Sequence, residues 1–248
     1  MIKHIPSLTI ITSHFDDISG LIMTFKSLKN QTFKNWRWLI IDAYTKDFFL
    51  KIPSEIKNGK KIEIFQLNSS IYDAMNLGIL NVETNYFHFL NCNSTYKDYD
   101  TLEKMLNFIF IDSSTEKKIY TAKLLIQNKS NKLFIQKPSK WFYPFKSGHE
   151  STIFPTMINN KLLIKSNLGI VADIVFLNDY EKFYKVHFLD LEFINYPKGG
   201  FSDSSKLIND KLNGYLKLLV ILFLRIKLIP FTYCLYRIFS LLKEFIVK

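Results

Sequence analysis

One acidic residue, Asp173, stands inside an otherwise apolar run of the sequence, Val171–Phe176 (VADIVF). Burying a carboxylate is costly, and desolvation raises its pKa toward the range of a usable general base. Asp173 is therefore the first candidate for removing a proton from a substrate hydroxyl. The competing interpretation is an acid that caps a helix or forms a structural ion pair.

Two further candidates, Phe15 and Asp42, follow the short apolar runs Leu8–Thr12 and Trp36–Ile41. A nucleotide base needs an apolar face and a polar partner at its edge. Phe15 offers a stacking surface, and Asp42 offers an acceptor for a pyrimidine N–H. The alternative is that Phe15 is a core aromatic and Asp42 caps the following turn.

The segment Ile71–Leu80 has the apolar spacing of a helix, and its first turns carry Asp73 and Asn76. Backbone N–H groups at a helix N-terminus favour a phosphate, so we expect these two residues at a phosphorylated ligand. In the alternative interpretation Ser69 or Ser70 is the N-cap and Asp73 is a first-turn acid that suits the helix dipole.

Short apolar runs and helical patterns alternate along the chain. Strands are expected at Leu8–Thr12, Trp36–Ile41, Ile62–Phe65 and Tyr86–Leu90, helices at Ile18–Leu28, Ile71–Leu80 and Leu102–Ile111, and a hairpin over Ile119–Gln136 with its turn near 128–131. This alternation predicts an α/β, mostly parallel, doubly wound sheet, in which ligands bind beyond the carboxyl ends of the strands.

Composition limits the class of protein. The 248 residues are 48% hydrophobic and 22% charged, which excludes a disordered chain. A net charge of +11 favours an anionic partner such as nucleic acid, a phosphorylated substrate or an acidic lipid surface. Cys92 and Cys234 match no zinc or redox spacing, so free thiols in a reducing compartment are expected. Neither a signal peptide nor an uncharged apolar stretch of membrane-spanning length is recognisable.

Several segments, in their order and spacing, resemble the family 2 glycosyltransferases with the GT-A (Rossmann-like) fold, of the bacterial polysaccharide-biosynthesis type. The resemblance covers about residues 6–202 and rests on LTIITSHFDD, TFKSLKNQTFKNWRWLIIDAYTKD, SSIYDAMNLGI, HFLNCNS, GHESTIF, VADIVF and KGGFS. It implies a GT-A domain over residues 1–205 and places the general base at Asp173. It also places a set of residues around the nucleotide sugar: Thr12, Phe15, Asp42, Asp73, Asn76, Asn91 and Asn93.

The sequence departs from this family after the fourth expected strand. The family carries a D-x-D acidic motif there, which holds Mg²⁺ or Mn²⁺ on the diphosphate, whereas residues 91–94 are Asn-Cys-Asn-Ser. Neutral oxygens bind these cations weakly, so we expect weak or absent metal binding, and the metal ligands are unknown. His149 and Glu150 match a His-Gln pair of the family and are expected at the acceptor or a phosphate. The alternative for His149 is a purely structural role.

Residues 206–248 form a separate basic tail. Helical projection from Phe231 onward separates polar from apolar side chains, and 215–248 carry six Lys or Arg residues against the single acid Glu244. This pattern is typical of an amphipathic helix that lies on an anionic membrane surface. The alternative is that the tail packs on the domain or forms a dimer contact.

Together these features predict an inverting glycosyltransferase, cytoplasmic and peripheral on the inner face of the cell membrane. It would move a sugar from a nucleotide-diphosphate donor to a glycan or lipid-linked acceptor in surface polysaccharide biosynthesis. One alternative is a catalytically impaired relative that acts as a sugar-binding or partner subunit. A nucleic-acid-binding protein is disfavoured, because the basic residues concentrate in an apolar tail and no recognised binding motif is present.

Overall fold

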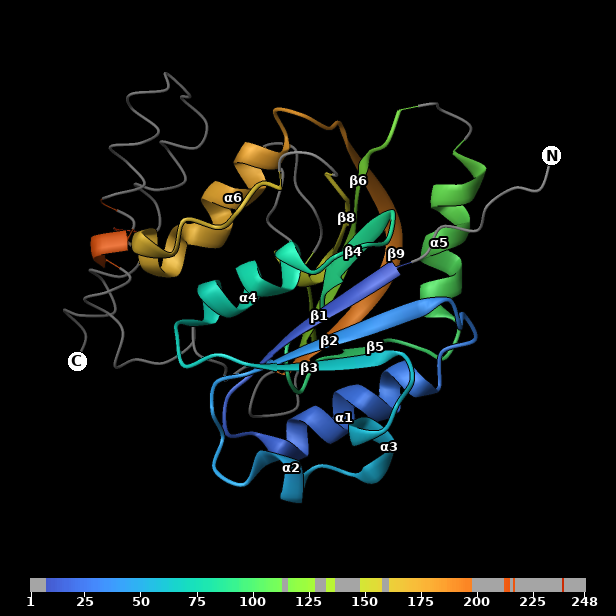
Figure 1. Ribbon diagram of the computed structural model, residues 1–248. Coiled ribbons are helices and arrows are strands. Elements are labelled where there is room, and N and C mark those ends of the chain that lie inside the picture. The colour runs from blue at the N-terminus through green and yellow to red at the C-terminus, as the bar shows by residue number, and fades with distance from the viewer. Residues whose placement is uncertain are drawn as a thin grey trace.

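The structure is a computed structural model, and it describes residues 8–112, 116–127, 133–136, 148–157, 161–197, 212–214, 216 and 238. Strands and helices alternate through most of the described chain (Figure 1). The strands are β1 Leu8–His14, β2 Trp36–Asp42, β3 Ile62–Gln66, β4 Tyr86–Phe89, β5 Thr95–Tyr96, β6 Ile119–Gln127, β7 Leu133–Gln136, β8 Thr152–Pro155 and β9 Val186–Pro197. The helices are α1 Ile18–Lys29, α2 Phe48–Lys51, α3 Ser54–Lys57, α4 Ile71–Leu80, α5 Thr101–Ile111 and α6 Ala172–Tyr180, with 3₁₀ turns η1 His149–Ser151 and η2 Ser166–Val171.

The nine strands of the described residues belong to one mixed, mostly parallel sheet with the order β3-β2-β1-β4-β8-β6-β9-β5, and β7 pairs with β6. The segment β3-β2-β1-β4 is parallel throughout, as the sequence predicts. Beyond β4 the sheet continues through the antiparallel strand β8, and β6 then runs parallel to β9. The expected hairpin is confirmed, because β6 and β7 pair antiparallel, while its turn lies outside the described residues.

Two apolar layers cover the sheet, one on each face. Side chains of α1 and α5 pack on one face, and side chains of α4 and α6 pack on the other. The alternation within β2 shows how one strand serves both layers. Trp38 and Ile40 join the first layer, whereas Leu39 and Ile41 join the second, and all four are fully buried.

Local contacts fix where the helices start. The Asp17 side chain accepts from the Gly20 amide and so begins α1, and a Cβ at Gly20 would stand only 2.2 Å from the Asp17 carboxylate. Ser70 and Asp73 begin α4, with the Ser70 hydroxyl accepting from the Asp73 amide and donating to the Asp73 carboxylate. The loops after β1 and β3 are therefore held in defined positions.

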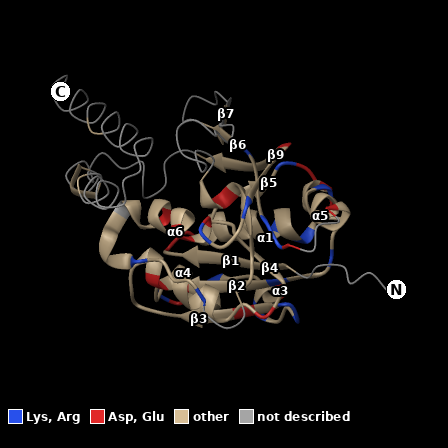
Figure 2. Ribbon diagram, turned by 90° about the horizontal axis from the view of Figure 1, so that it is seen from above, with Lys and Arg blue, Asp and Glu red and all other residues tan. Residues whose placement is uncertain are grey.

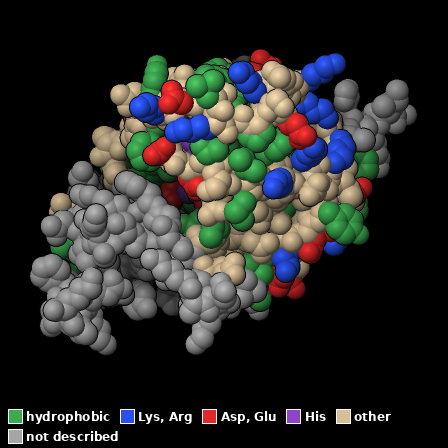
Figure 3. Space-filling view, turned by 90° about the horizontal axis from the view of Figure 1, so that it is seen from below, with side chains coloured by type: hydrophobic (Ala, Val, Ile, Leu, Met, Phe, Trp, Pro, Cys, Tyr) green, Lys and Arg blue, Asp and Glu red, His purple; other side chains and the backbone are tan. Residues whose placement is uncertain are grey.

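Charged side chains are spread over the surface. Figure 2 shows acidic residues on α4 and α6 at one end of the sheet. On the face seen in Figure 3, Lys and Arg side chains lie among acidic and apolar ones. Most of the tail expected over 206–248 lies outside the described residues. Within the described part of the chain, no helix combines the length and hydropathy needed to cross a bilayer.

Candidate nucleotide-sugar site

Unusual backbone conformations mark one edge of the sheet. Four non-glycine residues of the described chain have a positive φ: Asp16, Tyr44, Asp47 and Asn93. All four lie in the loops that follow β1, β2 and β4, beyond the carboxyl ends of parallel strands. Strained backbone of this kind gathers at functional sites, and this edge is where α/β sheets bind ligands. The candidate site is therefore built on these loops.

Phe15 and Asp42 lie on this edge in contrasting environments. Phe15 is 77% exposed, so the alternative of a core aromatic is wrong. Asp42 is fully buried, and its carboxylate accepts from His14 Nδ1 at 2.7 Å, from the Thr45 amide at 3.0 Å and from Gln66 Nε2 at 3.1 Å. Burial pushes the pKa of Asp42 up, but the hydrogen bonds from Thr45, Gln66 and His14 outweigh it and hold the pKa below its ordinary value.

The Thr12 side chain forms hydrogen bonds between neighbouring strands of the sheet. It is fully buried, and its hydroxyl donates to the Leu90 carbonyl at 2.6 Å and accepts from Trp38 Nε1 at 2.8 Å. These bonds join β1 to the end of β4 and to β2 and occupy the hydroxyl. A role of Thr12 at the nucleotide remains a prediction.

Asp73 and Asn76 lie on α4, and both contact the segment that leads into η2. Asp73 is half-buried at the first turn, and its pKa is lowered chiefly by the hydrogen bond from the Ser70 hydroxyl. Asn76 donates to the Ile164 carbonyl at 2.8 Å and accepts from the Ile164 amide at 2.7 Å. Asn76 thus ties α4 to the segment before η2, and Asp73 contacts Ser166, the first residue of η2, whose hydrogen bond also lowers the pKa of Asp73.

The loop after β4 is held by a carboxylate from elsewhere in the chain. Glu150, on η1, is only 4% exposed and accepts from Asn91 Nδ2 and, at 2.6 Å, from the Ser94 hydroxyl. Burial raises the pKa of Glu150, against the lowering effects of His149 and of these two hydrogen bonds. A carboxyl group thus lies beside a loop that contains no acid. Asn93, at the tip of the loop, is partly exposed.

His149, the neighbour of Glu150, connects this loop to Asp173. His149 Nδ1 lies 3.3 Å from Asp173 Oδ2, an ion-pair distance without the alignment of a hydrogen bond. Asp173 stands in the first turn of α6 and is partly exposed. Burial lowers the pKa of His149, but the nearby Asp173 and Glu150 outweigh it and raise the pKa above its ordinary value. The chain of contacts from Asn91 through Glu150 and His149 to Asp173 brings the predicted base to the strand-end loops.

Residues 9–148, more than half of the chain, match the family model described as glycosyl transferase family 2. The chain belongs to glycosyl transferase family 2. This assignment confirms the family that the motifs resemble.

Two curated relatives are uncharacterised glycosyltransferases of Rickettsia. The protein from Rickettsia felis is 31% identical over 122 residues, which are 47% of this chain and 20% of the relative. The protein from Rickettsia conorii is 32% identical over 116 residues, which are 44% of this chain and 19% of the relative. The matched region is thus about one fifth of the length of each relative.

Solved structures show the same fold at low sequence identity. Staphylococcus aureus TarS 1–349 in complex with UDP-GlcNAc is 16% identical with a TM-score of 0.64, and the match covers 86% of this chain and 66% of that one. The mannosyltransferase PcManGT from Pyrobaculum calidifontis, in complex with GDP-Man and Mn²⁺, is 8% identical with a TM-score of 0.60, covering 87% and 64%. These similarities confirm the α/β GT-A-like fold.

The divalent cation that this fold family uses does not fit the residues of the strand-end loop. Asn91, Asn93 and Ser94 supply neutral groups, and both oxygens of Glu150 accept hydrogen bonds from that same loop. Among the described residues, no three His, Cys, Asp or Glu side chains are grouped as metal ligands would be. Weak metal binding remains a prediction.

Two buried histidines, His88 and His14, are not among the site residues expected from the sequence. His88, inside β4, donates from Nε2 to the Glu150 carbonyl at 2.6 Å, and desolvation lowers its pKa to about 4. His14, at the end of β1, contacts Asp42. His88 is a polar residue inside an apolar run, the same signal that singled out Asp173, whereas His14 stands among polar residues after Leu8–Thr12 and carries no such signal.

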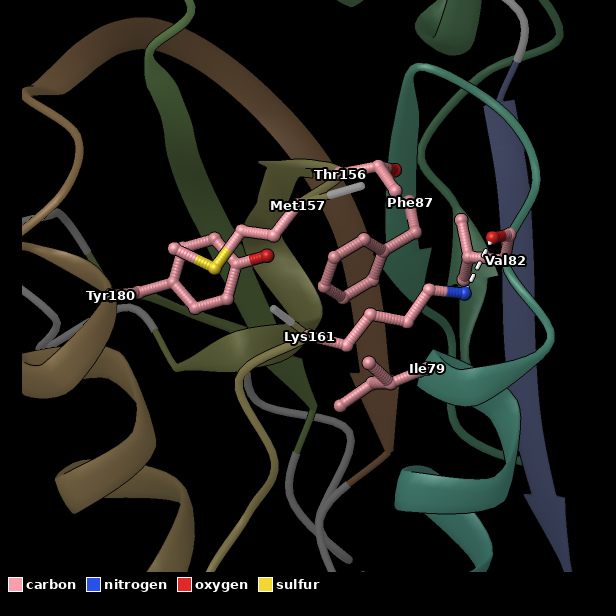
Figure 4. A pocket seen from close by; sticks show the side chains of 7 residues that line it. All are labelled: Ile79, Val82, Phe87, Thr156, Met157, Lys161 and Tyr180. Carbon is pink, nitrogen blue, oxygen red and sulfur yellow. Dashed lines mark hydrogen bonds between the residues drawn. The ribbon is translucent and has the colours of Figure 1, made fainter. Parts of the chain in front are cut away.

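A hollow on the molecule lies apart from these loops (Figure 4). Its lining residues come from the end of α4, from β4 and the segment after β8, and from α6: Ile79, Val82, Phe87, Thr156, Met157, Lys161 and Tyr180. The space between them does not admit a water molecule. Lys161 crosses it and donates to the carbonyls of Leu80 and Val82, at 2.7 and 2.8 Å. The lysine therefore caps carbonyl groups at the C-terminal end of α4, and its ammonium group is not directed at a ligand.

Proposed function

We propose that this chain transfers a sugar from a nucleoside-diphosphate sugar to a hydroxyl of a glycan or lipid-linked acceptor, with inversion. The observation that carries the proposal is the chain of contacts from Asn91 through Glu150 and His149 to Asp173. It brings a partly exposed carboxylate in the first turn of α6 to the strand-end loops of a family 2 fold.

Asp173 is the general base of the proposed reaction. Its carboxylate takes the proton of the acceptor hydroxyl while the hydroxyl oxygen forms a bond to the anomeric carbon. The bond from that carbon to the diphosphate breaks on the opposite face, and the nucleoside diphosphate leaves with the electron pair. His149, beside Asp173, and Glu150 are proposed at the acceptor or a phosphate.

Phe15 and Asp42 are proposed to hold the base of the nucleotide. The exposed ring of Phe15 supplies a stacking face. Asp42 is buried at the end of the neighbouring strand, and a base N–H would take the place of the hydrogen bond that Asp42 accepts from the exposed residue Gln66. Asp73 and the Asn91–Ser94 loop are proposed at the diphosphate and sugar, with the N-terminal amides of α4 offsetting the negative charge that develops on the leaving group.

The cellular setting belongs to the same proposal. We infer that the chain acts in surface polysaccharide biosynthesis on the cytoplasmic face of the cell membrane, held there by residues 215–248. The excess of basic over acidic residues in this segment supports the inference. A donor-binding relative without transfer activity is the second candidate, and the absence of acids from residues 91–94 favours it.

A calorimetric donor screen tests the proposal. UDP-, GDP- and dTDP-linked sugars are titrated into the whole chain, with Mn²⁺ and with EDTA. We expect one nucleotide class to bind with a Kd in the micromolar to millimolar range that is usual for substrates. Binding followed by nucleotide release on addition of acceptor supports transfer, and binding alone supports the second candidate. Failure of every donor to bind contradicts both.

A further inference from the structure

His14 connects the two loops that carry the proposed base-binding residues. It is the last residue of β1 and is 2% exposed. Its Nδ1 lies 2.7 Å from Asp42 Oδ1, and both side chains are wholly buried. Asp42 is the last residue of β2, directly opposite His14 in the parallel register. The pair therefore joins the carboxyl ends of the neighbouring parallel strands β1 and β2.

The second ring nitrogen of His14 determines the state of the imidazole. His14 Nε2 accepts a hydrogen bond from the Asp17 amide at 3.2 Å. A backbone N–H can only donate, so Nε2 must carry a lone pair and no proton. Since the carboxylate of Asp42 accepts at Nδ1, the proton must reside there. The contacts thus specify a neutral ring with its proton on Nδ1.

The backbone between these contacts turns sharply. Asp16 has a φ of 47°, in the left-handed region that few residues other than glycine adopt. Its amide donates to the Thr45 hydroxyl at 3.0 Å, and the Thr45 amide donates to Asp42 Oδ2 at 3.0 Å. Two successive amides, those of Asp16 and Asp17, are thus held by buried side chains of the neighbouring strand ends. This explains how the turn after Phe15 persists in a strained conformation.

We propose that His14 is the positioning residue of the nucleotide subsite. Its ring holds Asp42 on one side and, through the Asp17 amide, the turn carrying Phe15 on the other. The stacking face and the hydrogen-bonding edge for the base are then set before the ligand arrives, so binding does not have to order them. This inference rests on the proposed function, because it assigns His14 a task at that same subsite.

The first test needs no variant. The ring nitrogens of ¹⁵N-labelled histidine are recorded by NMR in the intact protein at neutral pH. We expect the His14 ring to carry its proton on Nδ1, with slow exchange because the pair is buried. A proton on Nε2, or a doubly protonated ring, would overturn the proposal whatever the protein binds.

The second test measures binding. His14→Asn keeps a donor near the Nδ1 position but has no acceptor at Nε2. We expect the Kd of the nucleoside diphosphate found in the donor screen to rise about tenfold, because the nucleotide subsite is no longer pre-organised. The kcat at saturating donor should stay within about threefold, because the proposed general base Asp173 is unchanged. The matched control is His187→Asn, which makes the same exchange at an exposed site on β9 and should leave the Kd unchanged.

Thr45→Val supplies a second variant if His14→Asn does not fold. It removes the acceptor for the Asp16 amide together with the contacts of the hydroxyl with His14 Nδ1 and Asp42, and it should also raise the Kd. An unchanged Kd in a folded variant would refute the positioning role while leaving the proposed function intact. If the wild-type chain binds no nucleotide, the proposed function and this role both fail, although the NMR result still reports the geometry of the ring.

Discussion

Asn91 and Glu150 form a hydrogen-bonded pair of an amide and a carboxyl group, and mutation can exchange the two groups between the positions. The family resemblance expects an acid near residue 91 and a glutamine at 150, whereas this chain has an amide and an acid. The contact between Asn91 Nδ2 and Glu150 Oε1 is compatible with either arrangement. We therefore expect Asn91→Asp and Glu150→Gln to be harmful singly and well tolerated together.

The magnitudes follow from the contacts of Glu150. A hydrogen bond to a buried ion contributes about 1.5–3 kcal/mol, and Glu150 accepts two, from Asn91 and Ser94. Glu150→Gln keeps one acceptor oxygen and should cost about 1–2 kcal/mol of unfolding free energy. Asn91→Asp places a second carboxylate against a buried one and should cost about 3–5 kcal/mol. In the double variant the new amide at position 150 donates to the new carboxylate at position 91, so the free energy of unfolding should fall by only about 1–2 kcal/mol.

Urea unfolding of the four proteins at neutral pH measures these changes as a double-mutant cycle. We expect a coupling energy of about 3–5 kcal/mol in favour of the double variant. Glu63→Gln combined with Asn91→Asp is the control, because Glu63 lies on β3, remote in sequence, and pairs with Arg37. Effects that add to within about 0.5 kcal/mol in the Asn91–Glu150 cycle would refute the reasoning.

Three further predictions concern pH, metal and the tail. Because Asp173 and Glu150 raise the pKa of His149 above 6.5 in spite of burial, its stabilising contribution is complete below that pH and is lost as the pH rises through the folded-state pKa. The difference in unfolding free energy between the wild type and His149→Gln should therefore shrink from about pH 6 to about pH 9, and a difference that grows would contradict this. Donor binding measured by calorimetry should change little on addition of EDTA, because residues 91–94 carry no carboxylate, whereas tight Mn²⁺ binding would count against the prediction. Deleting residues 215–248 should abolish sedimentation with anionic vesicles and leave nucleotide binding intact, and unfolding of the shortened chain would show that the tail belongs to the core.

The fold could be predicted wherever local signals agree. The bounds of α4 match the prediction because Ser70 caps its start and the apolar spacing is regular. The four parallel strands were found because each is a short apolar run. The strand β9 was missed, since VHFLDLEFINYP mixes apolar, charged and polar residues. Its partner β6 determines its conformation, and that pairing is a long-range property of the chain.

The candidate site could be predicted only in outline. The loops after β1, β2 and β4 could be located, because carboxyl ends of parallel strands share an edge. The contact of Glu150 with Asn91 joins residues 59 positions apart, so no spacing rule reveals it. For Asn76, the helix position was right but the contact with Ile164 was not foreseen, since it depends on how a distant segment returns to α4.

The rate of sugar transfer by Asp173→Asn tests the central claim most directly. The wild type and this variant are compared at saturating nucleotide sugar, with donor binding measured in parallel. If Asp173 is the general base, turnover should fall by about a hundredfold or more while the donor Kd stays within a few-fold, because the variant keeps the shape of the side chain and loses only its basicity. Turnover equal to that of the wild type would remove Asp173 from the mechanism and contradict the account.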